Sequence, residues 1–242
     1  MANRRRKTDS LILKFLKFLF ASKAAVLVIA LNVAVFVYFE RSTFAKTLFD
    51  MVVLYPGNLL QGKFWCLLTS GFLHSSKTHL ALNMLGVFVF GGIVERHLGF
   101  LKTMFIYVGA LFISMLFATG VYAFVLQQNI GIIGASGAVM GLMGAAMLLD
   151  PFCITYEMIL PLPVMVKGWM FIYADLKGFL SAEQDGVSHI SHLFGFLSVA
   201  LLVYFLSKKD KCMMRAGLVI NIFSFGVFLL ARHWILTGRV SF

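Results

Sequence analysis

The chain has 242 residues, of which 60% are hydrophobic and only 13% are charged, and its mean hydropathy is +0.91. Soluble globular domains carry about 25% charged residues, so the composition excludes a free soluble domain and a disordered chain. Three scattered cysteines also exclude a disulfide scaffold. Because about 20 apolar residues span a bilayer as a helix, we expect an all-α polytopic membrane protein with about six or seven spans.

The net charge of +11 gathers in two clusters beside apolar segments. The first lies near the N-terminus and the second late in the chain; they comprise Arg4, Arg5, Arg6, Lys7, Lys14, Lys17 and Lys23, and Lys208, Lys209, Lys211 and Arg215. Lysine and arginine mark cytoplasmic loops, so the basicity indicates membrane topology and not a nucleic-acid partner. We expect a multi-pass protein of the cell membrane with a cytoplasmic N-terminus.

In chain order, residues 1–23 form a basic cytoplasmic segment, in which Ser10 to Ser22 has the amphipathic pattern of a helix in the membrane interface. The apolar spans are expected at about 24–39, 78–94, 103–126, 130–149, 158–174, 187–207 and 216–231. Six crossings return the chain to the cytoplasm at its second basic cluster. We therefore divide it into a six-helix core, 24–207, and a C-terminal part with one additional transmembrane helix, 208–242.

Polar residues inside predicted spans are functional candidates, because a membrane interior disfavours them. The informative ones are His79 and Asn83 in the second span, Ser136 in the fourth, and His189 and His192 in the sixth. These three spans run in the same direction. At 1.5 Å rise per residue, we expect His79, Asn83, Ser136 and His192 to share a layer within roughly the outer 10 Å.

The setting of Ser136 favours a nucleophile. Gly137 and Gly141 form a small-xxx-small pair that lets another helix approach closely, and Gly195 follows His192 by one turn. The hydroxyl of Ser136 could then reach the imidazole of His192, which is the arrangement of a serine activated by a base.

No Asp or Glu falls in the second, fourth or sixth span, and Asp175 is expected in a loop. The sequence therefore predicts a Ser-His dyad and not a triad. An oxyanion needs preorganised donors, for which the Asn83 amide, the His79 imidazole and the Ser136 backbone N–H are the candidates.

Two alternatives concern the histidines. His189 and His192 could ligate a metal together with His74 and His79, although no carboxylate or cysteine is expected to complete that site, so we expect no metal and no cofactor. His189 also competes with His192 for the role of base. Only His192 has the following glycine, which favours it.

From about Phe64 to Ser207 the chain resembles a rhomboid intramembrane serine protease. Gly134-Ala-Ser-Gly137 fits the family's G-x-S-G, His192-Leu-Phe-Gly195 fits its H-x-x-G, and the segment HSSKTHLALN, residues 74–83, fits the spacing of its second core helix. The resemblance implies that Ser136 is the nucleophile and His192 the base. It also implies that His79 and Asn83 help to bind the oxyanion.

The resemblance further implies a serine-type endopeptidase that acts on single-span membrane proteins in or near the lipid bilayer. Three residues depart from the pattern: Cys66 stands where arginine is usual, Met140 where an aromatic residue often stacks on the histidine, and Val199 where glycine is expected. Two other classes stay open. They are a catalytically silent rhomboid-like protein that binds or escorts membrane helices, and a metal or small-solute transporter.

Overall fold

The computed structural model describes residues 22–42, 44–156, 160–181 and 186–237, so the predicted interfacial segment lies, except for Ser22, outside the described residues. The described helices are α2 (Lys23–Arg41), α3 (Ala45–Val52), α4 (Pro56–Leu60), α5 (Cys66–Thr69), η1 (Ser70–Phe72), α6 (Lys77–Gly86), η2 (Val87–Gly91), α7 (Gly92–Leu98), α8 (Phe100–Gly120), η3 (Val121–Val125), α9 (Ser136–Leu149), α10 (Val164–Leu180), α11 (His189–Leu202), η4 (Val203–Phe205) and α12 (Lys208–Thr237). Two short strands, β1 (Ile154–Thr155) and β2 (Leu162–Pro163), form a hairpin before α10.

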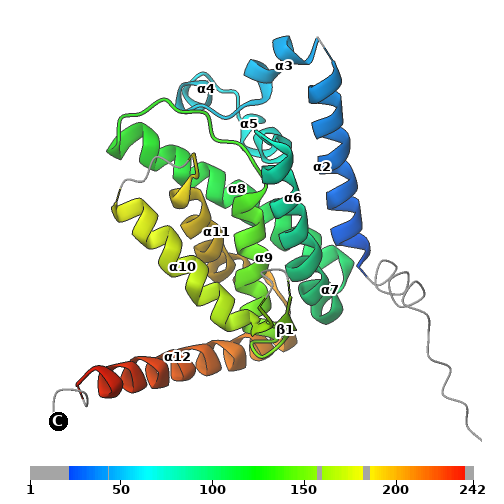
Figure 1. The fold of residues 1–242 in the computed structure, drawn as a ribbon. Coiled ribbons are helices and arrows are strands. Elements are labelled where there is room, and N and C mark those ends of the chain that lie inside the picture. The colour runs from blue at the N-terminus through cyan, green and yellow to red at the C-terminus, as the bar shows by residue number, and fades with distance from the viewer. Residues whose placement is uncertain (1–21, 43, 157–159, 182–185, 238–242) are drawn as a thin grey trace, which may run out of the picture.

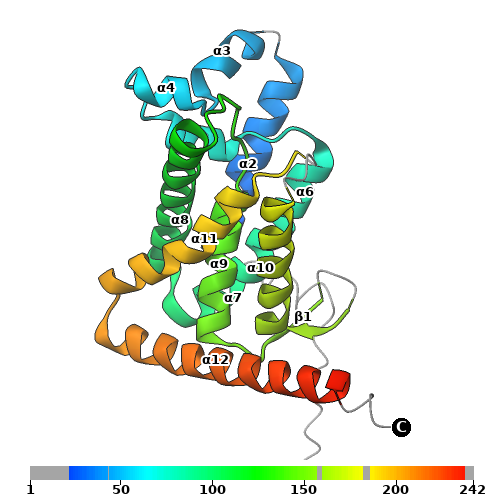
Figure 2. The same ribbon diagram turned by 90° about the vertical axis from the view of Figure 1, so that its left-hand side faces the viewer.

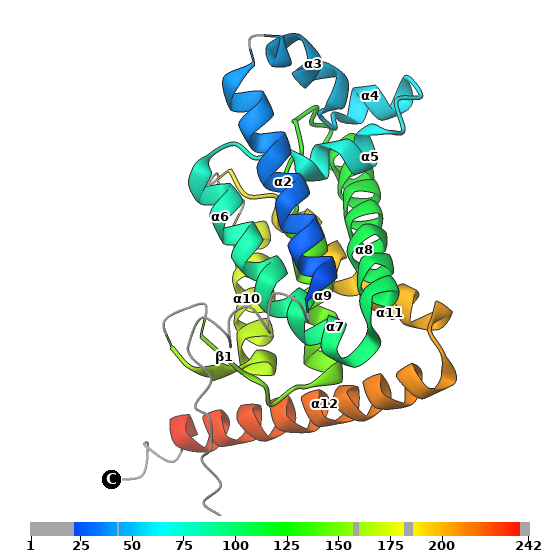
Figure 3. The same cartoon turned by 90° about the vertical axis from the view of Figure 1, so that its right-hand side faces the viewer.

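The helical segments α2, α6 with α7, α8, α9, α10 and α11 lie along one bundle (Figures 1 and 3). Within the described residues, four helices are long and apolar enough to cross a membrane, at Lys23–Arg41, Lys77–Leu98, Phe100–Val125 and Lys208–Ala231. Ser136–Leu149 and His189–Phe205 are shorter apolar helices. The prediction of an all-α polytopic membrane fold is confirmed.

Helix α9 lies at the centre of the bundle, packed against α8, α10, α11 and α12. It is buried from Gly137 to Met147 without interruption. Its glycines and alanines make this possible, because small residues let neighbouring helix backbones come close.

The start of α9 differs from the prediction. The fourth span was expected from residue 130, whereas the helix begins at Ser136. The preceding residues bond to the long connection between α2 and α6: the Ile132 N–H donates to the Leu54 carbonyl at 2.8 Å, and the Gly134 N–H to that of Ser70 at 3.0 Å. Ser136 is therefore the first residue of its helix and not one in its second turn.

Helix α10 also differs, and here the difference reaches the site. It was expected at 158–174 but runs from Val164 to Leu180, directly after Pro163 in the hairpin. Proline cannot occupy a helix interior without losing a hydrogen bond, so the helix starts after it. The expectation that Asp175 lies in a loop is wrong: Asp175 is inside α10 and only 4% exposed.

The expected additional transmembrane helix corresponds to α12, whose residues Lys208–Ala231 are long and apolar enough to cross a membrane. In the structure α12 lies across the end of the bundle at which α9 finishes and not alongside the other helices (Figure 2), so its role as a seventh span stays a prediction. Asn221 donates its Nδ2–H to the Met147 carbonyl at 2.8 Å. At Gly217 the two helices come so close that a Cβ would lie 1.9 Å from the Leu148 carbonyl oxygen. Specific contacts with α9 thus hold α12.

Candidate active site

Ser136 occupies the N-terminus of α9, after a turn that only glycine adopts easily. Gly134 has a φ of 108°, in the region that side chains other than glycine's disfavour. The Val139 N–H bonds to the Ala135 carbonyl, so the N–H groups before Val139 have no partner within the helix. Ser136 is half-buried and stands beside backbone donors.

His79 and Asn83 face this turn from α6. A Cβ placed on Gly134 would lie 2.8 Å from His79 Nε2 and 3.8 Å from Asn83 Nδ2. Ser76 fixes the start of α6, because its Oγ accepts the His79 backbone N–H at 3.0 Å. His79 and Asn83 therefore lie beside the turn that leads into Ser136, as the expected common layer requires on this side of the serine.

The neighbours of His79 decide which ring nitrogen carries the proton. The Ser75 backbone N–H donates to His79 Nδ1 at 3.5 Å, and the Ser75 hydroxyl lies 3.1 Å from the same atom. Because a backbone N–H only donates, Nδ1 is the acceptor, and the neutral ring carries its proton on Nε2. That N–H is directed towards the turn before Ser136.

On the other side, α11 brings His192 to α9. Gly195 makes the contact: a Cβ there would lie 2.2 Å from the Gly137 carbonyl oxygen. His192 is one turn before Gly195, and Ser136 is one residue before Gly137. The close packing of these glycines thus sets the imidazole and the hydroxyl on adjoining helix ends.

Asp175 holds the His192 ring from α10. The Nδ1 atoms of His192 and His189 lie 2.8 and 2.9 Å from the same carboxylate oxygen, Oδ1. A carboxylate only accepts, so each imidazole donates from Nδ1, and the Nε2 of a neutral His192 is left as an acceptor. His79 and His192 therefore adopt opposite tautomers, one presenting a donor and the other an acceptor.

His189 does not share the position of His192. A Cβ on Gly178 of α10 would lie 2.3 Å from His189 Nε2, so the far edge of that ring packs on the α10 backbone. His189 is thus turned towards α10, and the choice of His192 as the base stays a prediction drawn from Gly195.

The ligand atoms of Asp175, His189 and His192 lie within 4.8 Å of one another and could hold a metal ion. The expectation that no carboxylate would accompany these histidines is wrong. The partners proposed for them from the sequence, His74 and His79, are not members of the three-residue cluster that the described part of the chain contains.

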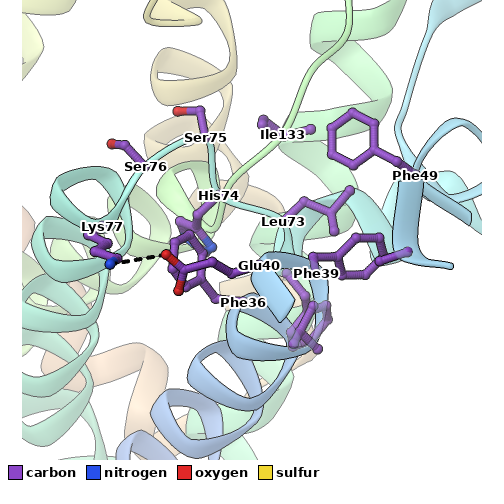
Figure 4. A pocket seen from close by; sticks show the side chains of 13 residues that line it. Phe36, Phe39, Glu40, Phe49, Leu73, His74, Ser75, Ser76, Lys77 and Ile133 are labelled. Carbon is purple, nitrogen blue, oxygen red and sulfur yellow. Dashed lines mark ion pairs between the residues drawn. The ribbon is translucent and has the colours of Figure 1, made fainter. Parts of the chain in front are cut away.

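A cavity of about 450 Å³ adjoins the site at His74 (Figure 4). It lies between α2, α3 and the residues before α6, and Glu40 and Lys77 pair across its edge at 3.0 Å. The His74 and His79 rings meet edge to face, with centroids 5.0 Å apart. Burial, and secondarily the charge of His79, lowers the pKa of His74 from 6.5 to about 4, so this ring is a neutral neighbour of the site.

Two of the three departing residues lie in the contact between α9 and α11. Val199 is buried, and a Cβ on Gly144 would lie 3.2 Å from its Cγ2, so Gly144 makes the room for this larger side chain. Met140 packs beside Gly195, its Cβ 3.0 Å from a Cβ built there. Cys66 lies outside this contact, and its thiol donates to the Met51 carbonyl.

Sequence reasoning missed Asp175 and Ser75. A signal for Asp175 existed, because a carboxylate between apolar residues of a membrane protein is itself a functional candidate. Ser75 gave no such signal, since its contact with His79 depends on how the residues before α6 turn.

Comparison with known proteins matches residues 61–209 to the family model of the Rhomboid domain. The Bacillus subtilis protein YdcA, named as a candidate rhomboid protease, is 26% identical over 76% of this chain and 88% of its own length. Rhomboid protease AarA of Providencia stuartii is 29% identical over 72% of this chain and 69% of its own. Rhomboid-like protein 11, chloroplastic, of Arabidopsis thaliana is 32% identical over 60% and 54%.

Proposed function

Since the chain belongs to the rhomboid family, we propose that it is an intramembrane serine endopeptidase in which Ser136 is the nucleophile and His192 the base. The strongest support is that the hydrogen-bond partners of His79 and His192 favour opposite tautomers. His79 turns an N–H towards the Gly134 turn, whereas His192 keeps its Nε2 as an acceptor because Nδ1 is bonded to Asp175. A hydrolase needs one group of each kind.

The proposed reaction is acyl transfer through the serine. Ser136 Oγ attacks the peptide carbonyl carbon while His192 Nε2 takes its proton. The oxyanion that forms is stabilised by the His79 Nε2–H, the Asn83 amide and backbone N–H groups at the start of α9. The C–N bond then breaks, and the leaving amine takes the proton from His192. Water then attacks the acyl carbon while the same imidazole takes its proton, the bond from that carbon to Ser136 Oγ breaks, and His192 returns the proton to Oγ.

We propose single-span membrane proteins as substrates, cut in or near the bilayer. Curated relatives named as rhomboid proteases support the reaction class, and a multi-pass chain shares the bilayer with such substrates. The basic cluster at the start of α12 supports a cytoplasmic position for the end of the bundle where α9 finishes. On that orientation the N-terminus is cytoplasmic and Ser136 lies towards the outer face of the cell membrane.

The test is labelling of the purified, detergent-solubilised protein with a fluorophosphonate serine probe. Wild type is compared with Ser136→Ala and His192→Ala. The matched controls are Ser198→Ala, a buried serine that bonds to its own helix at Gly195, and His97→Ala, whose ring bonds to the Ile93 carbonyl in α7. We expect labelling in wild type and both controls and its loss in both site variants.

Folded wild-type protein that takes no label would contradict the protease proposal. It would favour the catalytically silent alternative, a rhomboid-like protein that binds or escorts membrane helices. Labelling that survives Ser136→Ala would place the reactive serine elsewhere.

A further inference from the structure

A buried carboxylate on α10 is the least expected polar group of the bundle. Asp175 is 4% exposed, and its helix, α10, lies along the bundle (Figure 1). Burying a charge is costly unless it is paired and hydrogen-bonded. Its two described hydrogen bonds both come from imidazoles of α11, and its other oxygen, Oδ2, has no partner among the described residues.

We propose that Asp175 is a positioning residue that holds the His192 imidazole with its proton on Nδ1 and its Nε2 towards Ser136. This inference rests on the proposed function. It adds a carboxylate to the predicted dyad, so that Ser136, His192 and Asp175 have the roles of a catalytic triad. The carboxylate comes from α10, whereas the serine and the histidine come from α9 and α11.

The geometry supports one tautomer over the other. The 2.8 Å contact between His192 Nδ1 and Asp175 Oδ1 exists as a hydrogen bond only when Nδ1 carries the proton. With the proton on Nε2 instead, two acceptors would face each other inside the bundle and the ring could not accept the serine proton. Asp175 therefore favours the reactive form and also stabilises the imidazolium that forms once that proton is transferred.

His189 holds Asp175 in turn. It donates to the same oxygen at 2.9 Å, and its far edge packs on Gly178. The carboxylate is thus fixed between two rings of one helix, three residues apart. The position of Asp175 Oδ1 is therefore fixed by the packing of α10 against α11.

The experiment compares wild type, Asp175→Asn and Glu95→Gln with a peptide or transmembrane-segment substrate that wild type cleaves. Glu95 is the matched control: it is 7% exposed, and its carboxylate accepts from the Ala24 N–H at 2.9 Å at the start of α2, away from Ser136. Both changes replace a buried carboxylate by an amide of the same shape. We expect kcat to fall at least about tenfold in Asp175→Asn with KM little changed, within the roughly 10²- to 10⁴-fold that general-base catalysis supplies. Glu95→Gln should keep the wild-type kcat.

The pH profile adds a readout that a purely structural contact would not move. Among the residues that the structure describes, the titratable groups facing His192 are Asp175 on α10, His189 on α11 and His79 on α6. Removing the one anion among them makes the imidazolium less stable, so the acidic limb of kcat moves to lower pH in Asp175→Asn and stays in place in Glu95→Gln. An unchanged kcat and limb in Asp175→Asn would overturn the proposal while leaving the protease assignment intact.

An inactive wild type would contradict the proposed function but would not test the positioning role of Asp175. A spectroscopic measurement of the His192 tautomer tests that role without any activity. Protein labelled with ¹⁵N-histidine should show the His192 signal, assigned with His192→Gln, in the form protonated on Nδ1. In Asp175→Asn we expect that signal to shift towards the Nε2-protonated form. A wild-type signal already protonated on Nε2 would overturn the positioning role.

Discussion

A Cβ on Gly195 would lie 2.2 Å from the carbonyl oxygen of Gly137, so the α9 and α11 backbones touch between the serine and the histidine of the site. No side chain larger than hydrogen fits there without moving a helix, because the group it would meet is backbone. The register of Ser136 and His192 depends on this contact.

Gly195→Ala should therefore cost both stability and activity. We expect about 1–3 kcal/mol of destabilisation from overpacking and a marked loss of probe labelling, since α11 must move away from Ser136. Thermal unfolding and labelling rate measure the two effects. Gly120→Ala is the control, because nothing lies within 4 Å of a Cβ there, and it should keep both wild-type values. A fully active, equally stable Gly195→Ala protein would contradict the role given to this contact.

The sequence alone predicts part of the candidate site. Ser136, His192, His79 and Asn83 could be placed in one layer because alternate spans run the same way and their glycines mark the close contacts. The start of α9 could not be predicted in the same way. Residues 130–135 are as apolar as a membrane span, but they form no helix, because their backbone bonds to Leu54 and Ser70, which are distant in sequence.

The role of Asp175 could not be predicted for a different reason. Hydropathy alone places a charged residue outside a span, so the fifth span is predicted to end at residue 174. The two imidazoles that satisfy the carboxylate lie 14 and 17 residues further along the chain, on another helix. The hydropathy of the fifth span does not show that histidines of another helix will pair with Asp175.

Removing the proposed oxyanion donor Asn83 should slow the reaction without weakening substrate binding. We expect Asn83→Ala to lower kcat by roughly 10²- to 10³-fold, the usual effect of losing one such donor, with little change in KM. Ser75→Ala should have a smaller effect, because the Ser75 backbone N–H still donates to His79 Nδ1 and preserves the Nε2–H tautomer. Steady-state kinetics on both variants makes the comparison. Equal losses would show that the hydroxyl, and not the backbone, fixes the ring.

Metal removal should leave the protein unchanged. The Nδ1 atoms of His189 and His192 are both engaged with Asp175, and a metal would have to displace their protons. We expect EDTA treatment to alter neither labelling rate nor melting midpoint. If the histidines instead served metal binding, added Zn²⁺ would raise the midpoint of wild type and not that of His189→Ala, which would favour the metal alternative.

The burial of His74 predicts a dependence of stability on pH. Its pKa is about 4 in the folded protein and 6.5 when unperturbed, so between these values the unfolded chain binds more protons. The folded state is accordingly favoured in full above pH 6.5 and loses this contribution as the pH falls towards 4. One pKa unit corresponds to about 1.4 kcal/mol, and discounting for the partial exposure of the ring we expect a loss of about 1–2 kcal/mol.

Thermal unfolding at several pH values between 6.5 and 4 measures this loss. His74→Gln, which is polar but does not titrate, should show a shallower decline in melting midpoint than wild type over that range. Groups that do not interact with His74 titrate equally in both proteins and cancel in the difference. Parallel declines would mean that His74 is protonated as readily in the folded protein as in the unfolded chain, and that its burial beside His79 does not determine its charge.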